Sequence, residues 1–375
     1  MRRVVILQEY IPTYRVPFYQ ALRTRAAEEQ VDLVVACGRP SETQNLRADS
    51  GTVSFVQFFR QREVSLWGRR VVLRRVAEAI RGADLVVLEQ ARRNLDSYWL
   101  LGPARRRKPL VALWGHGRDY TRPTGNLDRR VRQWLTSRSD WFFAYTEGGA
   151  LAIISDGYPR GQTTVVQNSI DTTALRLGVA SVEPGTVTNF SHDHDLRGNT
   201  AIFLGALDES KRLDFLFEAA KITHTLNHDF RLLVAGDGAL RDDVEEWARS
   251  ESWITYLGTA RGQAKLVALA SVQVMAMPGR VGLVAVDSFA AGTPIVTTDW
   301  AWHAPEQEYL ESGVNAIITP DDVREFGREL AAVLADQKLL LSLSAACLIS
   351  SEQYTLEAMV ENYMGGIMRA LDTER

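Results

Sequence analysis

Short runs of β-branched residues alternate with longer amphipathic stretches along nearly the whole chain. This alternation is typical of parallel sheets that are covered by helices. At roughly 150 residues per domain, a chain of 375 residues predicts two or three such domains. The strands that we expect are residues 4–7, 31–36, 85–88, 110–114, 142–145 and 164–166 in the first half, and residues 201–204, 231–235, 254–257, 272–276 and 294–297 in the second.

The alternation is interrupted between about Gly178 and Asn199, where neither strand nor helix periodicity is visible. We interpret this interruption as a linker or surface loop at residues 176–200. It separates an N-terminal domain at residues 1–175 from a C-terminal domain at residues 201–353. The helical pattern of residues 354–375 could belong to either domain, and could pack back on the N-terminal one.

The predicted fold class is therefore α/β, with two doubly wound, Rossmann-like domains that face a cleft. In open α/β sheets, ligands bind beyond the carboxyl ends of the strands, so two facing sheets would each supply one wall of a binding site. The loops that follow the strands are where functional residues are expected.

Composition excludes several other classes of protein. With 46% apolar and 24% charged residues, the chain is an ordinary globular protein. Cys37 and Cys347 are the only cysteines, which is too few for a disulfide framework or a structural zinc site. The apolar run after Met1 is too short for a signal peptide, and no run of 18 apolar residues occurs. We expect a soluble, cytoplasmic protein.

The two halves of the chain differ in charge. Residues 1–150 contain 26 Lys and Arg against 15 Asp and Glu, a net charge of +11, which leaves −14 for residues 151–375. Such a positive domain would attract an anionic membrane surface, a phosphorylated acceptor or nucleic acid, unless it is merely a solvated arginine-rich surface. Nucleic acid is disfavoured because no recognition motif is present and the second half is acidic.

Residues Trp67–Arg81 contain several arginines and could form a basic amphipathic helix. A helix of this kind can rest on anionic lipid. We therefore expect peripheral contact with an anionic membrane, at the inner membrane face, and an acceptor that is lipid-linked or carries phosphate. A soluble natural-product acceptor remains open.

The first strand-end loop of the second half combines Gly205 with Lys211. The glycine lets the backbone approach a ligand, and the lysine adds its charge to the free N–H groups at the start of the next helix. This is the outline of a diphosphate site, although the same residue types also occur without any ligand. Gly236 and Gly238 follow the next strand, where they form either a simple turn or a lining of the nucleotide site.

A third loop, residues 277–294, is the most specific. A helix that opens at Gly282, Leu283 and Val284 can receive a phosphate at its N-terminus. Asp287 lies five residues beyond Gly282, where its carboxylate can accept hydrogen bonds from the hydroxyl pair of a ribose. The loop therefore suits a nucleotide ligand.

Together these motifs resemble the retaining GT-B glycosyltransferases of family 4 along the whole chain, residues 1–375. The residues that carry the resemblance are Val166–Asp171, Gly205 with Lys211, Gly236–Gly238, Tyr256–Gly258, Gly282–Val284 with Pro294, the opening Tyr10–Tyr19 and the pair His116-Gly117. The resemblance implies transfer of a sugar from a nucleoside-diphosphate sugar to a hydroxyl acceptor, with retention of configuration.

The resemblance also implies roles for individual residues. Lys211 would contact the donor diphosphate, Asp287 would stand where a Glu binds the ribose, and His116 would lie beside the transferred sugar. Tyr14 and Arg15 would contact the acceptor, although they could equally pack at the start of a helix. The donor side would further include Leu257, Arg280 and Glu306. Glu306 could instead cap a helix.

Two positions depart from the family pattern. The family has an Arg directly after the glycine of the first loop, where this chain has Ala206, and a Glu eight residues before the ribose-binding carboxylate, where it has Gly279. A subgroup with a Pro-Gly-x-Val-Gly-Leu loop matches residues 278–283. We expect Arg280 to replace the missing arginine.

The mechanism expected from these residues needs neither a covalent nucleophile nor a metal. No Ser-His-Asp set or motif-framed cysteine is present. Lys211 and a helix N-terminus can neutralise a departing diphosphate. The run His192–Asp195 has metal-ligating side chains, but we interpret it as a solvated loop. No cofactor is expected besides the nucleotide-sugar substrate.

Two other functions remain compatible with the sequence. One is a nucleotide-sugar epimerase of the same two-domain shape. The other is a catalytically weak partner subunit, suggested by Ala206 and Gly279. Fold likeness alone does not select among them, and the nucleotide base, the sugar and the oligomeric state stay open.

Overall fold

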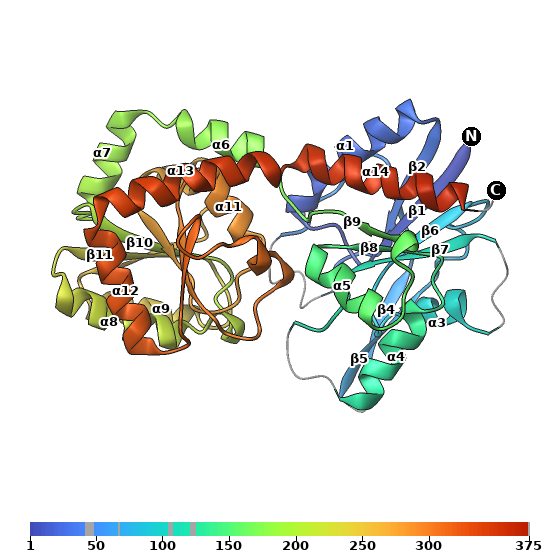
Figure 1. Ribbon diagram of the computed structural model, residues 1–375, viewed down its shortest axis with the longest axis horizontal. Coiled ribbons are helices and arrows are strands. Elements are labelled where there is room, and N and C mark those ends of the chain that lie inside the picture. Colours follow the sequence, from blue (N-terminus) through green and yellow to red (C-terminus); the bar gives the residue numbers. More distant parts are fainter. Residues whose placement is uncertain (42–48, 67, 104–107, 121–124, 374–375) are drawn as a thin grey trace. The chain divides into compact units, whose positions relative to one another are not determined.

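The computed structural model describes residues 1–41, 49–66, 68–103, 108–120 and 125–373. It divides into two compact units (Figure 1). The first unit comprises Met1–Ile170 together with Leu356–Arg375, and the second comprises Asp171–Thr355. Each unit contains its own parallel sheet with helices on its faces, which confirms the predicted α/β fold of two Rossmann-like domains.

The first unit is built on a seven-stranded sheet in the order β3-β2-β1-β6-β7-β8-β9. Every neighbouring pair is parallel. The central strands are almost wholly apolar because helices cover both of their faces. The strands are β1 (Arg2–Gln8), β2 (Val31–Cys37), β3 (Val56–Phe58), β6 (Leu85–Glu89), β7 (Leu110–Gly115), β8 (Trp141–Ala144) and β9 (Thr163–Val165).

Two apolar cores lie on the two faces of this sheet. One is formed with α1 (Val16–Glu28) and α14 (Leu356–Asp372), and the other includes residues of α3 (Leu95–Leu101), α4 (Asn126–Thr136) and α5 (Glu147–Ser155). The ring of Tyr363 in α14 stacks on Phe143 in β8, with centroids 4.4 Å apart. The C-terminal helix is therefore part of the first unit. Short 3-10 helices η1 (Thr13–Arg15) and η2 (Arg160–Gln162) complete this unit.

The predicted basic helix at residues 67–81 is wrong. The structure has an antiparallel hairpin there, formed by β4 (Gln61–Leu66) and β5 (Arg69–Arg74). Successive side chains of β5 point to opposite faces, so Arg70 and Arg74 turn toward the buried carboxylates of Glu9 and Asp96 while Leu73 is exposed. The arginines thus alternate as in a strand and do not gather on one helical face.

The second unit contains a six-stranded parallel sheet in the order β12-β11-β10-β13-β14-β15. Its strands are β10 (Asn199–Leu204), β11 (Phe230–Ala235), β12 (Ile254–Gly258), β13 (Val274–Ala276), β14 (Ile295–Thr298) and β15 (Ala316–Thr319). Its helices are α6 (Thr172–Ala180), α7 (Pro184–Asp193), η3 (Glu209–Lys211), α8 (Leu213–Leu226), α9 (Arg241–Ser250), α10 (Gln263–Ala270), α11 (Val284–Ala291), η4 (Pro305–Tyr309), α12 (Val323–Ala335) and α13 (Gln337–Gln353).

The predicted linker at residues 176–200 is also wrong, because α6 and α7 occupy most of it. The side chain of Asp171 caps α6 by accepting from the backbone N–H of Ala174, and Pro184 stands in the first turn of α7. No residue of α7 is fully buried, and Leu177 in α6 is 61% exposed. Because these helices bury so few side chains, their apolar periodicity is weak in the sequence.

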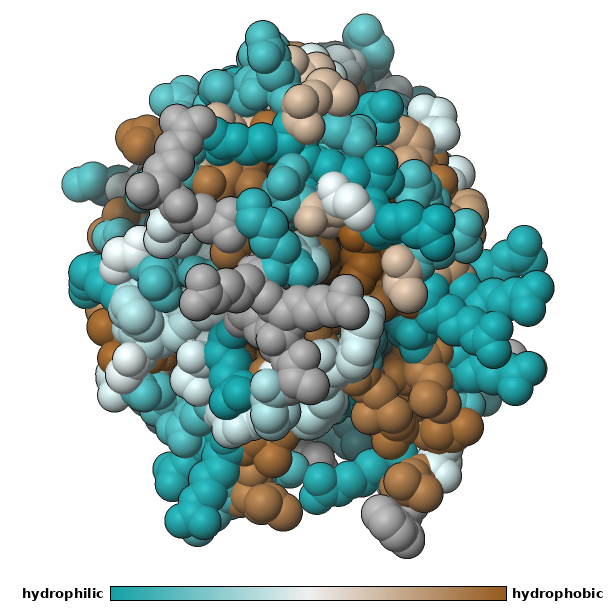
Figure 2. Space-filling model, turned by 90° about the vertical axis from the view of Figure 1, so that its right-hand side faces the viewer, coloured by the Kyte–Doolittle hydropathy of each residue, from teal (hydrophilic) through white to brown (hydrophobic). Residues whose placement is uncertain are grey.

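Figure 2 shows one face of the structure, on which hydrophilic side chains predominate and hydrophobic ones gather in smaller patches between them. Within the described residues, no single helix is both long and apolar enough to cross a membrane, and only the pair Val323–Ala335 and Gln337–Asp372, bent by 93°, meets that test jointly.

Candidate functional site

Three loops of the second unit interlock at the carboxyl ends of β10, β11 and β13. The backbone N–H of Leu207 donates to the carbonyl of Asp237 over 3.0 Å, which joins the first loop to the second. The backbone N–H of Arg280 donates to the carbonyl of Ser210 over 2.8 Å, which joins the first loop to the third. The glycine-containing loops singled out in the sequence are therefore parts of one structure.

Two glycines allow these loops to touch. A Cβ atom built on Gly236 would lie 1.8 Å from the carbonyl oxygen of Gly205, and one built on Gly279 would lie 2.4 Å from the carbonyl carbon of Lys211. Real Cβ atoms do not approach backbone atoms so closely. Gly279 is thus required by the contact with Lys211.

Lys211 is the cation at the centre of this contact. Its Nζ donates a hydrogen bond to the carbonyl oxygen of Arg280 over 2.6 Å. Burial lowers the pKa of Lys211 to about 8, an effect that Asp208 and Glu306 oppose and that the neighbouring Arg280 reinforces. An anion placed beside this ammonium would restore its charge, because desolvation is the main cause of the shift.

Arg280 and Glu306 lie near the same lysine. The guanidinium of Arg280 is half-buried, and burial lowers its pKa while Asp208 and Glu306 raise it. Glu306 is only 4% exposed, within η4, and its Oε2 would lie 3.6 Å from a Cβ atom built on Gly282. The structure therefore brings Lys211, Arg280, Gly282 and Glu306 together.

His303 holds the third loop in place. The backbone N–H of Val281 donates to its Nδ1 over 3.0 Å, and its Nε2 lies 2.9 Å from the carbonyl oxygen of Thr298. Nδ1 must therefore be unprotonated while Nε2–H donates to Thr298. Burial lowers the pKa of His303, and the nearby cations including Lys211 lower it further, which is the direction that favours the neutral ring these hydrogen bonds require.

Asp287 lies in the first turn of α11, which begins just after Gly282. The Nζ of Lys265 in α10 donates to Oδ1 of Asp287 over 2.6 Å. The first N–H groups of a helix have no partner within the helix and carry its positive dipole end. Leu283 and Val284 therefore present backbone donors on the same helix that carries the carboxylate.

The remaining donor-side residues lie on the second loop and the neighbouring strand. Gly238 follows Asp237, whose side chain accepts from the Gly238 N–H over 2.8 Å. Leu257 is near the end of β12, and the hydroxyl of the adjacent Tyr256 donates to the carbonyl of Gly236 over 2.9 Å. Strand β12 thereby supports the glycine turn.

His116 belongs to the first unit, where it follows β7. Its ring lies 4.7 Å from that of Tyr145 and 5.8 Å from that of Tyr120. Gln90 accepts a hydrogen bond from the backbone N–H of Gly117 over 3.0 Å. Gly117 has a φ of +74°, a conformation that glycine adopts without strain. His116 is thus half-buried on a fixed turn at the carboxyl edge of the first sheet.

Arg15 lies beneath that turn and Tyr14 lies outside it. Arg15 is 4% exposed, donates to Asn168 over 2.5 Å, and its guanidinium lies 4.9 Å from the ring centre of Trp114 and 5.6 Å from that of Tyr145. Arg15 is therefore packed at the start of α1, which is the alternative that the sequence left open beside an acceptor contact, and it supports His116 through Tyr145. Tyr14 is 45% exposed.

Charged groups are also buried at this edge of the first sheet. Glu9 follows β1, and its backbone N–H donates to Oε2 of Glu89 at the end of β6 over 3.0 Å. Arg74 binds both Asp96 and Glu89. Burial raises the pKa of Glu89 to about 7, although Arg74 acts in the opposite direction.

One protein-family model matches a large part of the second unit. Residues 198–336 match the family model of the glycosyl transferases group 1. No curated protein sequence matches the chain significantly.

Solved structures of glycosyltransferases resemble both units. HepE from Anabaena, in complex with UDP-glucose, gives a TM-score of 0.70 at 15% identity over 98% of this chain and 100% of its own. Sucrose-phosphate synthase from Thermosynechococcus elongatus gives 0.70 at 14% identity over 100% of each chain. The pneumococcal O-GlcNAc transferase GtfA, with UDP and GlcNAc, gives 0.65 at 11% identity over 99% of each chain. These likenesses establish the GT-B fold.

Three side chains of the segment that matches the glycosyl transferases group 1 were not expected to contribute. Asp208 accepts from the N–H and hydroxyl of Ser210, a turn that Asp followed by Ser two residues later can signal. His303 lies three residues before Glu306, the one residue of this segment for which a role was expected. Lys265 is 22 residues from Asp287 in the sequence, and no local pattern could have paired them.

The run His192–Asp195 is not the loop that was expected, because His192 and Asp193 form the end of helix α7 and His194 caps it. Asp195 binds Arg197 and Arg231, whose hydrogen bonds lower its pKa to about 2. Among the described residues, no group of three or more His, Cys, Asp and Glu side chains is placed to hold a metal ion.

Proposed function

We propose that the protein is a retaining, family 4 type glycosyltransferase that moves a sugar from a nucleoside-diphosphate sugar to a hydroxyl acceptor. The observation that carries this proposal is the contact of Lys211 with Arg280, in the loop that leads into α11, within the segment that matches the glycosyl transferases group 1. The resemblance to structures solved with UDP and UDP-glucose makes UDP the first nucleotide to test.

In the proposed reaction, the bond between the anomeric carbon and the diphosphate oxygen breaks. The acceptor oxygen attacks from the same face, and its proton passes to the departing phosphate. Lys211, Arg280 and the N–H groups at the start of α11 stabilise the negative charge that develops on the diphosphate. Because these groups already supply cationic charge, we propose that no metal is required.

The other residues would orient the two substrates. Asp287 would accept hydrogen bonds from the ribose, sharing its carboxylate with Lys265. Glu306, beside Gly282, would bind a hydroxyl of the donor sugar. His116 would hydrogen-bond to the transferred sugar from the first unit, and the exposed Tyr14 would contact the acceptor.

A thermal-shift comparison of nucleoside diphosphates with pyrophosphate tests the donor side. We expect UDP or another nucleoside diphosphate to stabilise the wild type. Lys211→Ala should weaken the binding of both UDP and pyrophosphate. Asp287→Ala should weaken the binding of UDP alone, because pyrophosphate has no ribose. Lys338→Ala and Asp242→Ala, which remove the same charges from exposed helix positions, should leave both ligands unaffected.

Incubation with the nucleotide sugar alone separates transfer from the two rival functions. Release of an epimerised sugar would favour an epimerase, and absence of hydrolysis or transfer with intact nucleotide binding would favour a partner subunit. Absence of any nucleotide-induced stabilisation would contradict the donor site itself.

A further inference from the structure

One face of the β4-β5 hairpin combines cationic and aliphatic side chains. In an antiparallel ladder, directly paired residues point to the same side, and successive residues alternate between the two sides. The N–H of Arg75 donates to the carbonyl of Arg60 over 2.9 Å, which continues the register of the hairpin by one pair. The register therefore places on one side, called here the outer face, the pairs Arg60 with Arg75, Arg62 with Leu73, Val64 with Val71 and Leu66 with Arg69.

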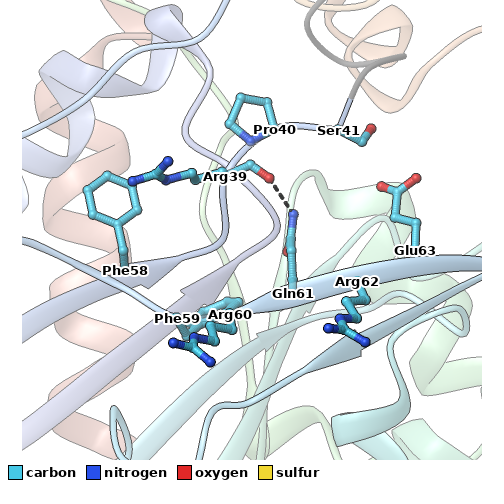
Figure 3. A pocket seen from close by; sticks show the side chains of 9 residues that line it. All are labelled: Arg39, Pro40, Ser41, Phe58, Phe59, Arg60, Gln61, Arg62 and Glu63. Atoms are coloured by element: carbon cyan, nitrogen blue, oxygen red, sulfur yellow. Dashed lines mark hydrogen bonds between the residues drawn. The ribbon is translucent and has the colours of Figure 1, made fainter.

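The opposite face of the hairpin is turned toward the rest of the first unit, where Val72 and Arg74 are buried. Figure 3 shows how the side chains alternate on β4: Gln61 and Glu63 lie on the side of the strand opposite to Arg62. The outer face is thus the side of the hairpin that is exposed to solvent.

The apolar members of the outer face are exposed next to one another. Val64, Leu66 and Leu73 are 44%, 49% and 44% exposed. Residues two apart on a strand, and residues on the paired strand, are neighbours on one face. Single exposed aliphatic residues are ordinary, whereas adjoining ones indicate a contact surface.

The outer face also has an excess of positive charge. Arg60, Arg62 and Arg75 are exposed, and within the described part of the chain none of the three forms an ion pair with a carboxylate. Arg69 is exposed as well and pairs with Asp128 of α4 over 2.9 Å. None of the residues of the outer face is acidic. An anionic surface would therefore attract this face.

The hairpin is anchored through its other face. Arg70 binds the buried carboxylate of Glu9, which follows β1, and Arg74 binds Asp96 of α3. Arg74 and Asp96 are both buried. The outer face is thus carried by a fixed element, so that little ordering is needed when it binds.

We propose that the outer face of the hairpin docks the protein on an anionic lipid bilayer. Each arginine near an anionic leaflet strengthens binding by roughly fivefold, and aliphatic side chains beside it can enter the headgroup layer. Nucleic acid fits less well, because its recognition uses side chains that stack on bases or read their edges. The net positive charge of residues 1–150 acts in the same direction as the outer face. This contact goes beyond the proposed glycosyl transfer and does not depend on it.

Cosedimentation of the full-length protein with phosphatidylglycerol vesicles tests the contact, with phosphatidylcholine vesicles as the reference. Salt at about 150 mM screens attraction beyond about 8 Å, so that groups close to the lipid dominate. Arg60→Gln/Arg62→Gln removes two cations of the outer face, and Arg81→Gln/Arg160→Gln removes two exposed arginines elsewhere in the first unit. We expect the first variant to lose at least about tenfold in affinity for the anionic vesicles, and the second to lose less than about twofold.

The aliphatic side chains are tested separately, because replacing them leaves the charge unchanged. Val64→Ser/Leu66→Ser should lose at least about fivefold in affinity for the same vesicles. Leu177→Ser/Leu226→Ser is the matched control, since these two leucines of the second unit are 61% and 60% exposed. It should bind the vesicles as the wild type does.

A wild type that does not bind phosphatidylglycerol vesicles would overturn the proposal, and so would equal losses in the outer-face variants and their controls. Outer-face variants that bind vesicles normally but lose a dimer seen by light scattering would instead assign the face to a second copy of the chain. All the substituted side chains are exposed, so the urea unfolding midpoint and any UDP-induced stabilisation should stay at wild-type values. If UDP stabilises none of the proteins, the proposed donor site fails, while the vesicle comparison still decides whether the hairpin binds lipid.

Discussion

Gly279 and Lys211 are in contact through their backbones, and a Cβ atom on Gly279 would lie 2.4 Å from both the carbonyl carbon and the carbonyl oxygen of Lys211. The loop after β13 therefore lies directly against the loop after β10. The carbonyl of Arg280, the next residue, accepts the hydrogen bond from Lys211 Nζ. A side chain at position 279 would push apart the two loops that carry the donor-side cations.

Gly279→Ala should consequently weaken donor binding. The methyl group has no space, so the 277–283 loop must shift and Lys211 must lose its partner at Arg280. We expect at least about a tenfold rise in the dissociation constant of the nucleoside diphosphate, together with about 1–3 kcal/mol of lost stability. Calorimetric titration measures the first quantity and denaturant unfolding the second.

Gly185→Ala is the matched control, because a Cβ atom there meets nothing within 4 Å and alanine favours the helix α7. It should bind nucleotide as the wild type does. A Gly279→Ala protein with unchanged nucleotide affinity would show that the contact between the two loops does not shape the site.

Donor affinity should fall as pH rises above 8. Burial lowers the pKa of Lys211 to about 8, so the free protein loses this positive charge above that pH. A diphosphate prefers the charged form, and its own ionisation is complete near pH 7. The dissociation constant should thus rise by roughly tenfold per pH unit above 8, until the neutral form binds appreciably.

Lys211→Arg provides the control for this pH effect, since arginine stays charged throughout the range. Its nucleotide affinity should be nearly flat from pH 7 to 9.5, whatever its absolute value. A wild-type profile as flat as that of Lys211→Arg would mean that Lys211 does not titrate, or does not bind the diphosphate.

His303→Ala should raise the donor KM more than it lowers kcat. The variant leaves the N–H of Val281 without its buried acceptor, which costs about 1–3 kcal/mol and loosens the loop before α11. Both ring nitrogens are already engaged by Val281 and Thr298, so we expect the imidazole to position the loop and not to transfer a proton. Steady-state kinetics at several pH values check this.

The pH profile distinguishes positioning from proton transfer. In His303→Ala the pH dependence of kcat should keep its wild-type shape. Loss of an ionisation from that profile would instead assign His303 a chemical role.

The sequence predicted correctly the strands that bury continuous apolar runs. It did not predict the elements whose conformation depends on contacts with side chains from distant segments. Strands β1 and β10 were expected within about two residues, because each is an unbroken apolar run. The β4-β5 hairpin was mistaken for a helix because the acidic partners of Arg70 and Arg74 come from other segments, Glu9 and Asp96 among them.

The donor-side residues likewise include some that the sequence could predict and some that it could not. Lys211 and Gly282 could be found from their places at strand ends, where the fold puts ligands. The link from Lys265 to Asp287 joins two helices, and the need for Gly279 arises from a contact across 68 residues, so neither could be recognised along the chain.

Glu89 should make the stability of the first unit depend on pH. Burial raises the pKa of Glu89 to about 7, above its value in an unfolded chain. Between those two values the folded protein binds more protons than the unfolded one, so the unfolding free energy falls as pH rises, and this contribution is lost by about pH 8. Among the neighbours of Glu89, Arg74 and Arg93 lower its pKa whereas Glu9 raises it, and their balance sets the size of the effect.

Glu89→Gln should flatten this dependence, since its amide oxygen can still accept from the N–H of Glu9 and carries no charge. We expect the wild type to lose on the order of 1–3 kcal/mol between pH 5 and 8 that the variant keeps. Urea unfolding followed by tryptophan fluorescence measures both. The exposed control Glu78→Gln should behave as the wild type, and parallel pH curves for wild type and Glu89→Gln would refute a raised pKa at this position.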